Sequence, residues 1–367
     1  MNHRSRSRVT IEDLNKAVRR FPTHQTLGLI NRISEEEDKD SEISKYFPGP
    51  EAQGHKPPIF TQPGLAFVAK QSIIHSNDYR GSAPAWQEIA RLCSIYNNIE
   101  DPVVEASPQD RFAVVQFLVR TAYEQFPLQQ NIRNLISRAL YLFEIIPLEL
   151  RGSRHALDVD SIFRQLTGLG VREFLQYGFS VWAMSTKHLL DQNRFAQYEQ
   201  RLNFFTQNGV AQFLNHVASD YEHFRHAARQ EEEGLTWKKQ AFNSLWQWPI
   251  IAPAVKELGG YIVPIPRLLL HRVTDGVYYD FLSQSLSKDA RDKFLTFFGD
   301  IFQAYVGKLL EAYYEPSELF AERVYGRDQT TVDWIAIEGR TAILFECKSK
   351  RFIKASKRIA LRERSHP

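Results

Sequence analysis

The sequence predicts a mostly α-helical protein, in which a large N-terminal helical domain is followed by a small, incomplete α/β core. Two observations lead to this fold class. Apolar residues recur at helical spacing through most of residues 62–290, whereas residues 332–347 contain two apolar runs separated by a glycine-containing turn. The length of 367 residues, with 43% hydrophobic and 24% charged residues, is sufficient for two or three globular domains.

Composition also predicts the compartment. The chain has two cysteines, Cys93 and Cys347, which are too few for a disulfide framework and favour a reducing environment. No apolar run reaches the roughly eighteen residues of a membrane span. Residues 1–6 lead into no apolar signal region. We therefore expect a cytoplasmic protein with no membrane partner.

Residues 1–60 are predicted to be a polar, partly irregular N-terminal segment. One helix is expected at 11–21, because Thr10 can act as its N-cap and Asp13 stands three residues later. The remainder, with an acidic run at 35–38 and several prolines, is expected to be loop.

Residues 61–245 are predicted to form a helical domain. One helix is expected at 107–126, where a cap is followed by proline and an acidic residue, and another at 131–146, ending at Pro147. The Gly-Leu-Gly of 168–170 is expected to cap a helix rather than to bind a dinucleotide, because it follows a helical pattern and not a strand.

Residues 246–286 are rich in proline and glycine and are predicted to be an ordered connector. The C-terminal core is expected to occupy 287–367. Ser287 can cap its first helix, and apolar residues at steps of three and four predict helix over 294–313.

The apolar runs 332–337 and 341–347 are rich in β-branched and aromatic residues and predict a β-hairpin. Gly339 and Arg340 are expected to form a two-residue loop, which fixes the register of the two strands. In that register both faces of the hairpin are apolar, so a central hairpin covered on both faces is expected.

Three charged residues interrupt this hairpin: Asp333, Glu346 and Lys348. The register places Asp333 directly opposite Glu346, and the alternation of a strand puts Lys348 on the same face. Two such carboxylates repel each other unless they share a hard cation such as Mg²⁺, which takes oxygen ligands. The nearby ammonium can orient a metal-bound water or balance phosphate charge. The alternative is an edge hairpin with three solvated surface charges.

This arrangement resembles the PD-(D/E)xK nuclease superfamily, the restriction-endonuclease-like phosphodiesterases. The resemblance covers residues 290–360: a helix precedes Asp333, and Glu346-Cys347-Lys348 follows it after twelve intervening residues. It implies that Asp333 and Glu346 are catalytic metal ligands for Mg²⁺ or Mn²⁺ and that Lys348 assists the catalytic base. It also implies DNA rather than RNA as the substrate and a role in bacterial phage defence or repair.

The sequence departs from the family pattern at three points. Val332 replaces the proline of the motif. Gln303 stands where the helix of the family carries an acidic residue, with Asp300 and Glu311 as possible substitutes. Only nineteen residues follow Lys348, so the last strand of the core is expected to be missing. An incomplete sheet leaves an unpaired edge, and we therefore expect self-association or a second chain that completes the sheet.

Basic residues are concentrated after the motif. Residues 348–367 contain eight Lys or Arg and one acidic residue, a net charge of +7, whereas the whole chain has a net charge of +3. A helix is expected at 351–361, with its basic residues facing outward. The predicted nucleic-acid contacts are Lys350, Arg351, Lys354, Lys357 and Arg358. The alternative is a solvated basic tail.

Two functions follow from these observations. The first is a metal-dependent nuclease whose helical domain recognises nucleic acid or a partner. The second is a non-enzymatic helical interaction protein that carries a degenerate or truncated nuclease-like core.

Overall fold

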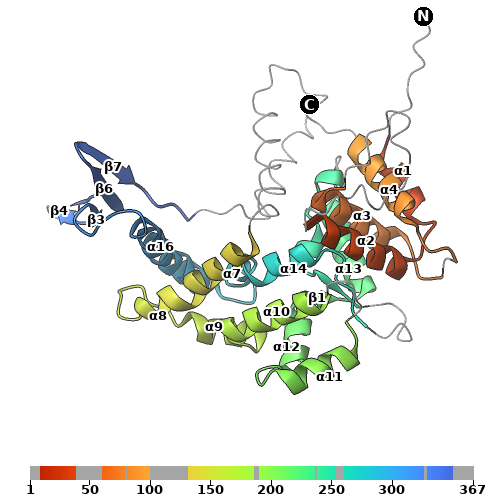
Figure 1. Cartoon of the computed structure of the whole chain (residues 1–367), viewed down its shortest axis with the longest axis horizontal. Coiled ribbons are helices and arrows are strands. Elements are labelled where there is room, and N and C mark those ends of the chain that lie inside the picture. Colours follow the sequence, from red (N-terminus) through yellow and green to blue (C-terminus); the bar gives the residue numbers. More distant parts are fainter. Residues whose placement is uncertain are drawn as a thin grey trace, which may run out of the picture. The chain divides into compact units, whose positions relative to one another are not determined.

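The structure, a computed structural model, describes residues 9–38, 60–79, 81–99, 131–185, 190–235, 238–252, 260–325 and 329–349 (Figure 1). Within these ranges the protein is mostly helical, with a small sheet near the C-terminus, as the sequence predicts. No helix among them is long and apolar enough to cross a bilayer. The helices predicted at 107–126 and 351–361 lie outside the described ranges.

The chain divides into two compact units. The first unit contains the described residues of Met1–Ile132 and Phe174–Gly276, and the second contains those of Arg133–Glu173 and Val277–Ile353. The sequence predicted four consecutive segments instead. Each unit combines stretches that are far apart in the chain, a feature that composition along the chain does not reveal.

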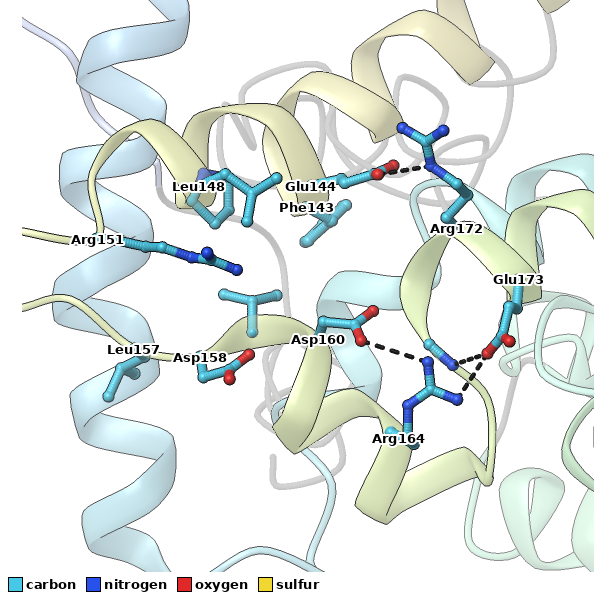
Figure 2. Close-up of a pocket in the computed structure, with 13 residues that line it drawn as sticks. Phe143, Glu144, Leu148, Arg151, Leu157, Asp158, Asp160, Arg164, Arg172 and Glu173 are labelled. Atoms are coloured by element: carbon cyan, nitrogen blue, oxygen red, sulfur yellow. Dashed lines mark hydrogen bonds and ion pairs between the residues drawn. The ribbon is translucent and has the colours of Figure 1, made fainter.

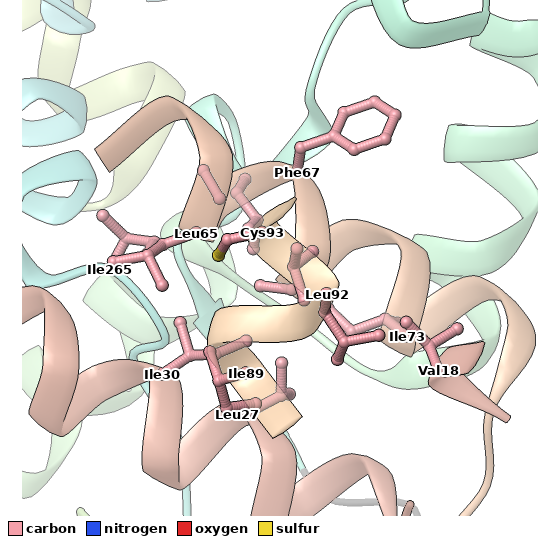
Figure 3. Close-up of a cluster of buried hydrophobic side chains, with 14 of the residues drawn as sticks. Val18, Leu27, Ile30, Leu65, Phe67, Ile73, Ile89, Leu92, Cys93 and Ile265 are labelled. Atoms are coloured by element: carbon pink, nitrogen blue, oxygen red, sulfur yellow. The ribbon is translucent and has the colours of Figure 1, made fainter. Parts of the chain in front are cut away.

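The N-terminal helices of the first unit are α1 (Ile11–Val18), α2 (Thr23–Asp38), α3 (Gln62–His75) and α4 (Trp86–Asn98). Helix α3 is buried almost throughout, because the other three helices pack around it. Figure 3 shows Leu27 and Ile30 of α2 beside Ile89 of α4, and Leu65 of α3 beside Cys93 of α4, in this cluster. Each such buried aliphatic side chain contributes about 1.5–3 kcal/mol.

The start of α1 agrees with the prediction, whereas α2 is a correction. The backbone N–H of Thr10 donates to Asp13 Oδ2 at 2.9 Å, which completes the expected cap. Helix α2 occupies residues that were expected to be loop. Its residues Leu27, Ile30 and Ile33 recur at steps of three and are buried. Burial against α3 outweighs the weak helix propensity of its polar and glycine residues.

The remaining elements of the first unit include α11 (Gln192–Arg201), α12 (Gln207–Val217), α13 (Tyr221–Glu232), α14 (Pro266–Val273), η4 (Lys238–Gln240), η5 (Ser244–Trp246), and the parallel pair β1 (Ala218–Ser219) and β2 (Ile250–Ile251). Helix α10 (Val171–Ser185) belongs to this unit from Phe174 onward.

The described residues of the segment 246–286, predicted to be a connector, belong to the cores of the two units instead. Helix α14 is buried along its whole length. Asn31 Nδ2 donates to the backbone oxygen of Val263 at 2.8 Å, which joins this segment to α2. Pro266 stands at the first position of α14, where its missing N–H is tolerated, so this proline starts an element rather than marking a linker.

The helical elements of the second unit are α7 (Ile132–Leu140), the π-helical turn η3 (Tyr141–Ile145), α8 (Ile146–Glu149), α9 (Val159–Thr167), α15 (Val277–Asp280) and α16 (Lys288–Leu310). The predicted stop at Pro147 is wrong, because the chain remains helical to Glu149. The π-helical turn, which ends at Ile145, changes the hydrogen-bonding pattern just ahead of Pro147 and accommodates the proline ring. Gly168, in the left-handed region with φ 81°, ends α9 as expected.

Aromatic rings form the core of the second unit. Phe281 stacks on Phe294 with ring centroids 4.3 Å apart, and Phe143 lies 5.8 Å from Phe298. These contacts join η3 and the residues after α15 to α16. As expected, Ser287 caps α16, since its hydroxyl accepts the N–H of Ala290 at 3.2 Å.

The sheet of the second unit contains β3 (Leu319–Ala321), β6 (Trp334–Glu338) and β7 (Thr341–Phe345), all antiparallel, in the order β3-β6-β7. A separate pair is formed by β4 (Val324–Tyr325) and β5 (Gln329–Thr330). The predicted hairpin register is confirmed, with Trp334 opposite Phe345 and Glu338 opposite Thr341. Gly339 adopts φ 61° in the two-residue loop, which the turn requires of its first residue.

Among the described residues only one face of the hairpin is covered. Trp334 and Ala336 face α16, and Ala336 is fully buried. On the other face Leu344 is 62% exposed. The expectation of cover on both faces is therefore not met within the described residues. Exposed apolar side chains are common on folded proteins, so an apolar face does not by itself require a covering layer.

A buried ion pair stabilises the first unit and can be tested. Lys70, fully buried in α3, lies 2.8 Å from Glu232, which also accepts a hydrogen bond from Gln71. Lys70→Met should lower the free energy of unfolding by about 3–5 kcal/mol, because the buried carboxylate loses its counter-charge. The double variant Lys70→Met/Glu232→Gln should recover much of that loss. Urea unfolding of the full chain measures the stability of both variants. If the single and the double variant lost equal stability, the two charged residues would not be coupled.

Candidate functional site

The three charged residues predicted from the sequence lie at one end of the sheet. Asp333 directly precedes β6, and Glu346 directly follows β7, so both residues stand one position beyond the last pair of the hairpin, Trp334 opposite Phe345. Lys348 Nζ is 3.8 Å from Glu346 Oε1, and their side chains are 69% and 57% exposed. Asp333 is half-buried. The structure thus has the half-buried carboxylate of Asp333 near the exposed carboxylate of Glu346 and the exposed ammonium of Lys348.

The backbone of the motif holds Asp333 in place. The N–H of Cys347 donates to Asp333 Oδ2 and ties the start of β6 to the chain after β7. Burial and then the neighbouring Asp333 carboxylate raise the pKa of the Cys347 thiol to about 11. Strand alternation by itself would point Cys347 away from Asp333, but the alternation does not extend to Cys347 because β7 ends at Phe345.

The three helix residues considered for the family's acidic position have different surroundings. Gln303 lies close to the sheet: its backbone oxygen accepts the indole N–H of Trp334 at 3.0 Å, and its amide donates to Glu322 Oε2 at 3.2 Å. Asp300 pairs with His155 Nδ1 at 3.0 Å. Glu311 follows the last residue of α16 and is exposed. Of the three, Gln303 is the residue whose described contacts reach the candidate site.

Glu322 is a candidate site residue that the sequence analysis missed. Its backbone N–H donates to the oxygen of Asp333 at 2.9 Å, which extends the β3–β6 ladder by one pair. Glu322 and Asp333 therefore face each other at the ends of β3 and β6, and Glu346 directly follows the neighbouring strand β7. The sequence signal for this position is a short apolar run, Leu319–Ala321, followed by an acidic residue. A strand of three residues is too short for its register to be predicted from the sequence.

The donor set suits a hard divalent cation. The carboxylates supply only oxygen ligands, the type that Mg²⁺ and Mn²⁺ prefer. No three His, Cys, Asp or Glu side chains converge closely enough, within the described ranges, to enclose an ion by themselves. Mg²⁺ often binds one or two carboxylates and completes its shell with water and substrate phosphate. Asp333 and Glu346 would supply those two ligands.

The remaining predicted contacts cannot be placed in this arrangement. Lys350, Arg351, Lys354, Lys357 and Arg358 all lie outside the described residues. Their assignment to nucleic-acid binding stays a prediction.

Comparison of this chain with models of protein families, with curated proteins and with solved structures found no match.

Helix α16 fixes the start of β6 through a close contact. The Trp334 ring lies over Gly307, where an added Cβ would be 2.1 Å from Trp334 Cζ2. The glycine thus permits the approach that also allows the indole N–H to reach Gln303. Because Asp333 is the residue before Trp334, this contact positions the candidate ligand.

Gly307→Ala should lower the free energy of unfolding by about 1–3 kcal/mol, because the added methyl group overpacks the contact with Trp334. Gly299→Ala is the matched control in the same helix, where no atom lies within 4 Å of the added Cβ. That substitution should stabilise the protein by up to about 1 kcal/mol through helix propensity. Thermal unfolding followed by tryptophan fluorescence measures both. If the two variants gained stability equally, the close contact would be absent.

Proposed function

We propose that the C-terminal part of the second unit is a metal-dependent phosphodiesterase that hydrolyses nucleic acid, with DNA as the expected substrate. The observation that carries the proposal is one arrangement of elements. Helix α16 is followed by an antiparallel sheet whose middle strand begins after Asp333 and whose next strand leads directly into Glu346 and Lys348. This is the order that the resemblance to PD-(D/E)xK nucleases implies.

Each residue has a distinct role in the proposal. Asp333 and Glu346 bind Mg²⁺ or Mn²⁺, and Glu322 adds negative charge from the neighbouring strand. The bound cation would polarise the phosphodiester and lower the pKa of an attacking water. The Cys347 N–H keeps the Asp333 carboxylate oriented. The Lys348 ammonium, next to Glu346, stabilises charge that develops on the phosphate. A role in phage defence or repair is the setting that the resemblance suggests.

A non-enzymatic interaction protein is the second candidate. The observation that favours it is the exposed face of the sheet, where Leu344 is 62% accessible. Within the described residues β7 also has no partner strand on its outer edge. Such an edge can pair with a second copy or another chain. In this case the helical part of the protein would bind the partner, and the carboxylates would have no catalytic role.

Metal binding and cleavage separate the two candidates. Mg²⁺ or Mn²⁺ should stabilise the wild-type protein, by about 2.7 kcal/mol at a hundred times Kd. Asp333→Asn should remove this stabilisation and any DNA cleavage, because the amide keeps the volume but loses the charge. Lys348→Ala should keep the stabilisation and lose cleavage. Thermal melts with and without the ion, together with a plasmid and RNA cleavage assay, measure these outcomes.

Glu338→Gln is the matched control for these variants. Glu338 lies at the opposite end of β6 and accepts a hydrogen bond from the Tyr314 hydroxyl, which an amide can also accept. This variant should respond to metal as the wild type does. If Mg²⁺ stabilised the Asp333→Asn protein as much as the wild type, the assignment of Asp333 as a metal ligand would be wrong. The interaction protein would then be the better candidate.

The basic residues of 348–367 generate a separate prediction. If they contact phosphates, DNA affinity should fall steeply as salt rises from about 50 to 200 mM. The triple variant Lys354→Gln/Lys357→Gln/Arg358→Gln should reduce the slope of log affinity against log salt by about 3. Arg91→Gln, an exposed residue of α4 in the first unit, is the control and should leave the slope unchanged. Fluorescence anisotropy with labelled duplexes measures the slope, and an unchanged slope in the triple variant would exclude these contacts.

A further inference from the structure

The second unit contains a pocket that is separate from the candidate phosphodiesterase site. It has a volume of about 340 Å³ and lies between η3, α8 and the start of α9, with the start of α10 at its rim (Figure 2). This volume is in the range of sites that bind small molecules. Its apolar lining comes from Phe143, Pro147, Leu148, Leu157 and Val159.

Ion pairs fix the polar wall of this pocket. Arg164 lies 2.7 Å from Glu173 and 3.5 Å from Asp160, and Arg172 lies 2.6 Å from Glu144. The N–H of Gly170 donates to Glu173 at 2.8 Å, and this hydrogen bond lowers the pKa of Glu173. Both arginines therefore already have carboxylate partners.

The backbone at Gly170 lies close to this wall. A Cβ at Gly170 would lie 2.4 Å from an Arg164 guanidinium nitrogen and 2.7 Å from Asp160 Oδ1. Because these atoms are at the ends of their side chains, a methyl group at position 170 would displace Arg164 and Asp160 from their present positions. The Gly170 backbone and the two side chains therefore pack at short distance.

Arg151 differs from the other two arginines. Its side chain extends into the pocket between Leu148 and Asp158 (Figure 2). Among the described residues its guanidinium has no hydrogen bond or ion pair, whereas Asp158 uses its carboxylate to cap α9 by accepting the N–H of Ser161 at 3.0 Å. The pocket therefore combines one uncompensated planar cation with an apolar lining.

We propose that this pocket binds a small monocarboxylic acid with an apolar body. The guanidinium of Arg151 matches a carboxylate by two parallel hydrogen bonds. The apolar body of the ligand would contact Phe143 and Leu148. A doubly charged phosphate group fits less well, because the carboxylates of Asp158 and Asp160 also line the pocket and repel it. The ligand class does not depend on the nuclease chemistry.

Three probes of the same shape and different charge test this assignment on the full chain: phenylacetate, phenylacetamide and phenyl phosphate. Titrations followed by saturation-transfer NMR give the dissociation constants. Phenylacetate should bind most tightly. Arg151→Gln should weaken phenylacetate binding by about ten- to a hundredfold, as expected for the loss of a charge-assisted pair. Its effect on the neutral amide should be less than about threefold, because the amide makes no ion pair with the guanidinium.

Arg154→Gln is the matched control. Arg154 is an exposed arginine in the same loop and does not line the pocket. This variant should bind phenylacetate as the wild type does. The proposal fails if the wild type binds no phenylacetate at millimolar concentration, if the amide binds as tightly as the acid, or if both arginine variants weaken binding equally. Because Arg151 is on the surface, circular dichroism should show that both variants fold normally.

Discussion

The contact between the Trp334 indole and helix α16 is the interaction on which the candidate site depends. The ring packs on Gly307 and its N–H reaches the backbone oxygen of Gln303. This contact places the first residue of β6 against the helix, and the antiparallel register then fixes the neighbouring strands on either side. Asp333, one residue earlier, has its position set by a helix that it does not belong to. The chemistry of the site therefore depends on packing on the opposite face of the sheet.

Local patterns in the sequence were sufficient to predict the structure where a single residue imposes a conformation. Gly339 determines the two-residue loop, and the loop determines every pair in the hairpin, so the register follows from the sequence alone. Gly168 and Ser287 end and begin their helices for equally local reasons. The same register predicts that Asp333 lies opposite Glu346, one position beyond the last pair of the strands.

Features that depend on distant parts of the chain could not be predicted in this way. Helix α2 is stabilised by burial against α3, and its own residues are only moderate helix formers. The π-helical turn before Pro147 has no clear signature in the residue types. Glu322 enters the candidate site only because β3 pairs with β6, a pairing that no turn between the two strands specifies. Helix α2 and the position of Glu322 therefore depend on contacts that are not local, whereas sequence periodicity reports local order.

Both compact units are assembled from separate stretches of the chain, and this limits how the chain can be divided into fragments that fold. The aromatic core of the second unit joins Phe143 and Phe163, from one stretch, to Phe281 and Phe298, from another. A fragment that ends before α16 would leave Phe143 without Phe298, and a fragment that begins at α16 would lack the helices on which α16 packs. The helices of the second unit and its carboxylate-bearing sheet can thus not be separated by cutting the chain once.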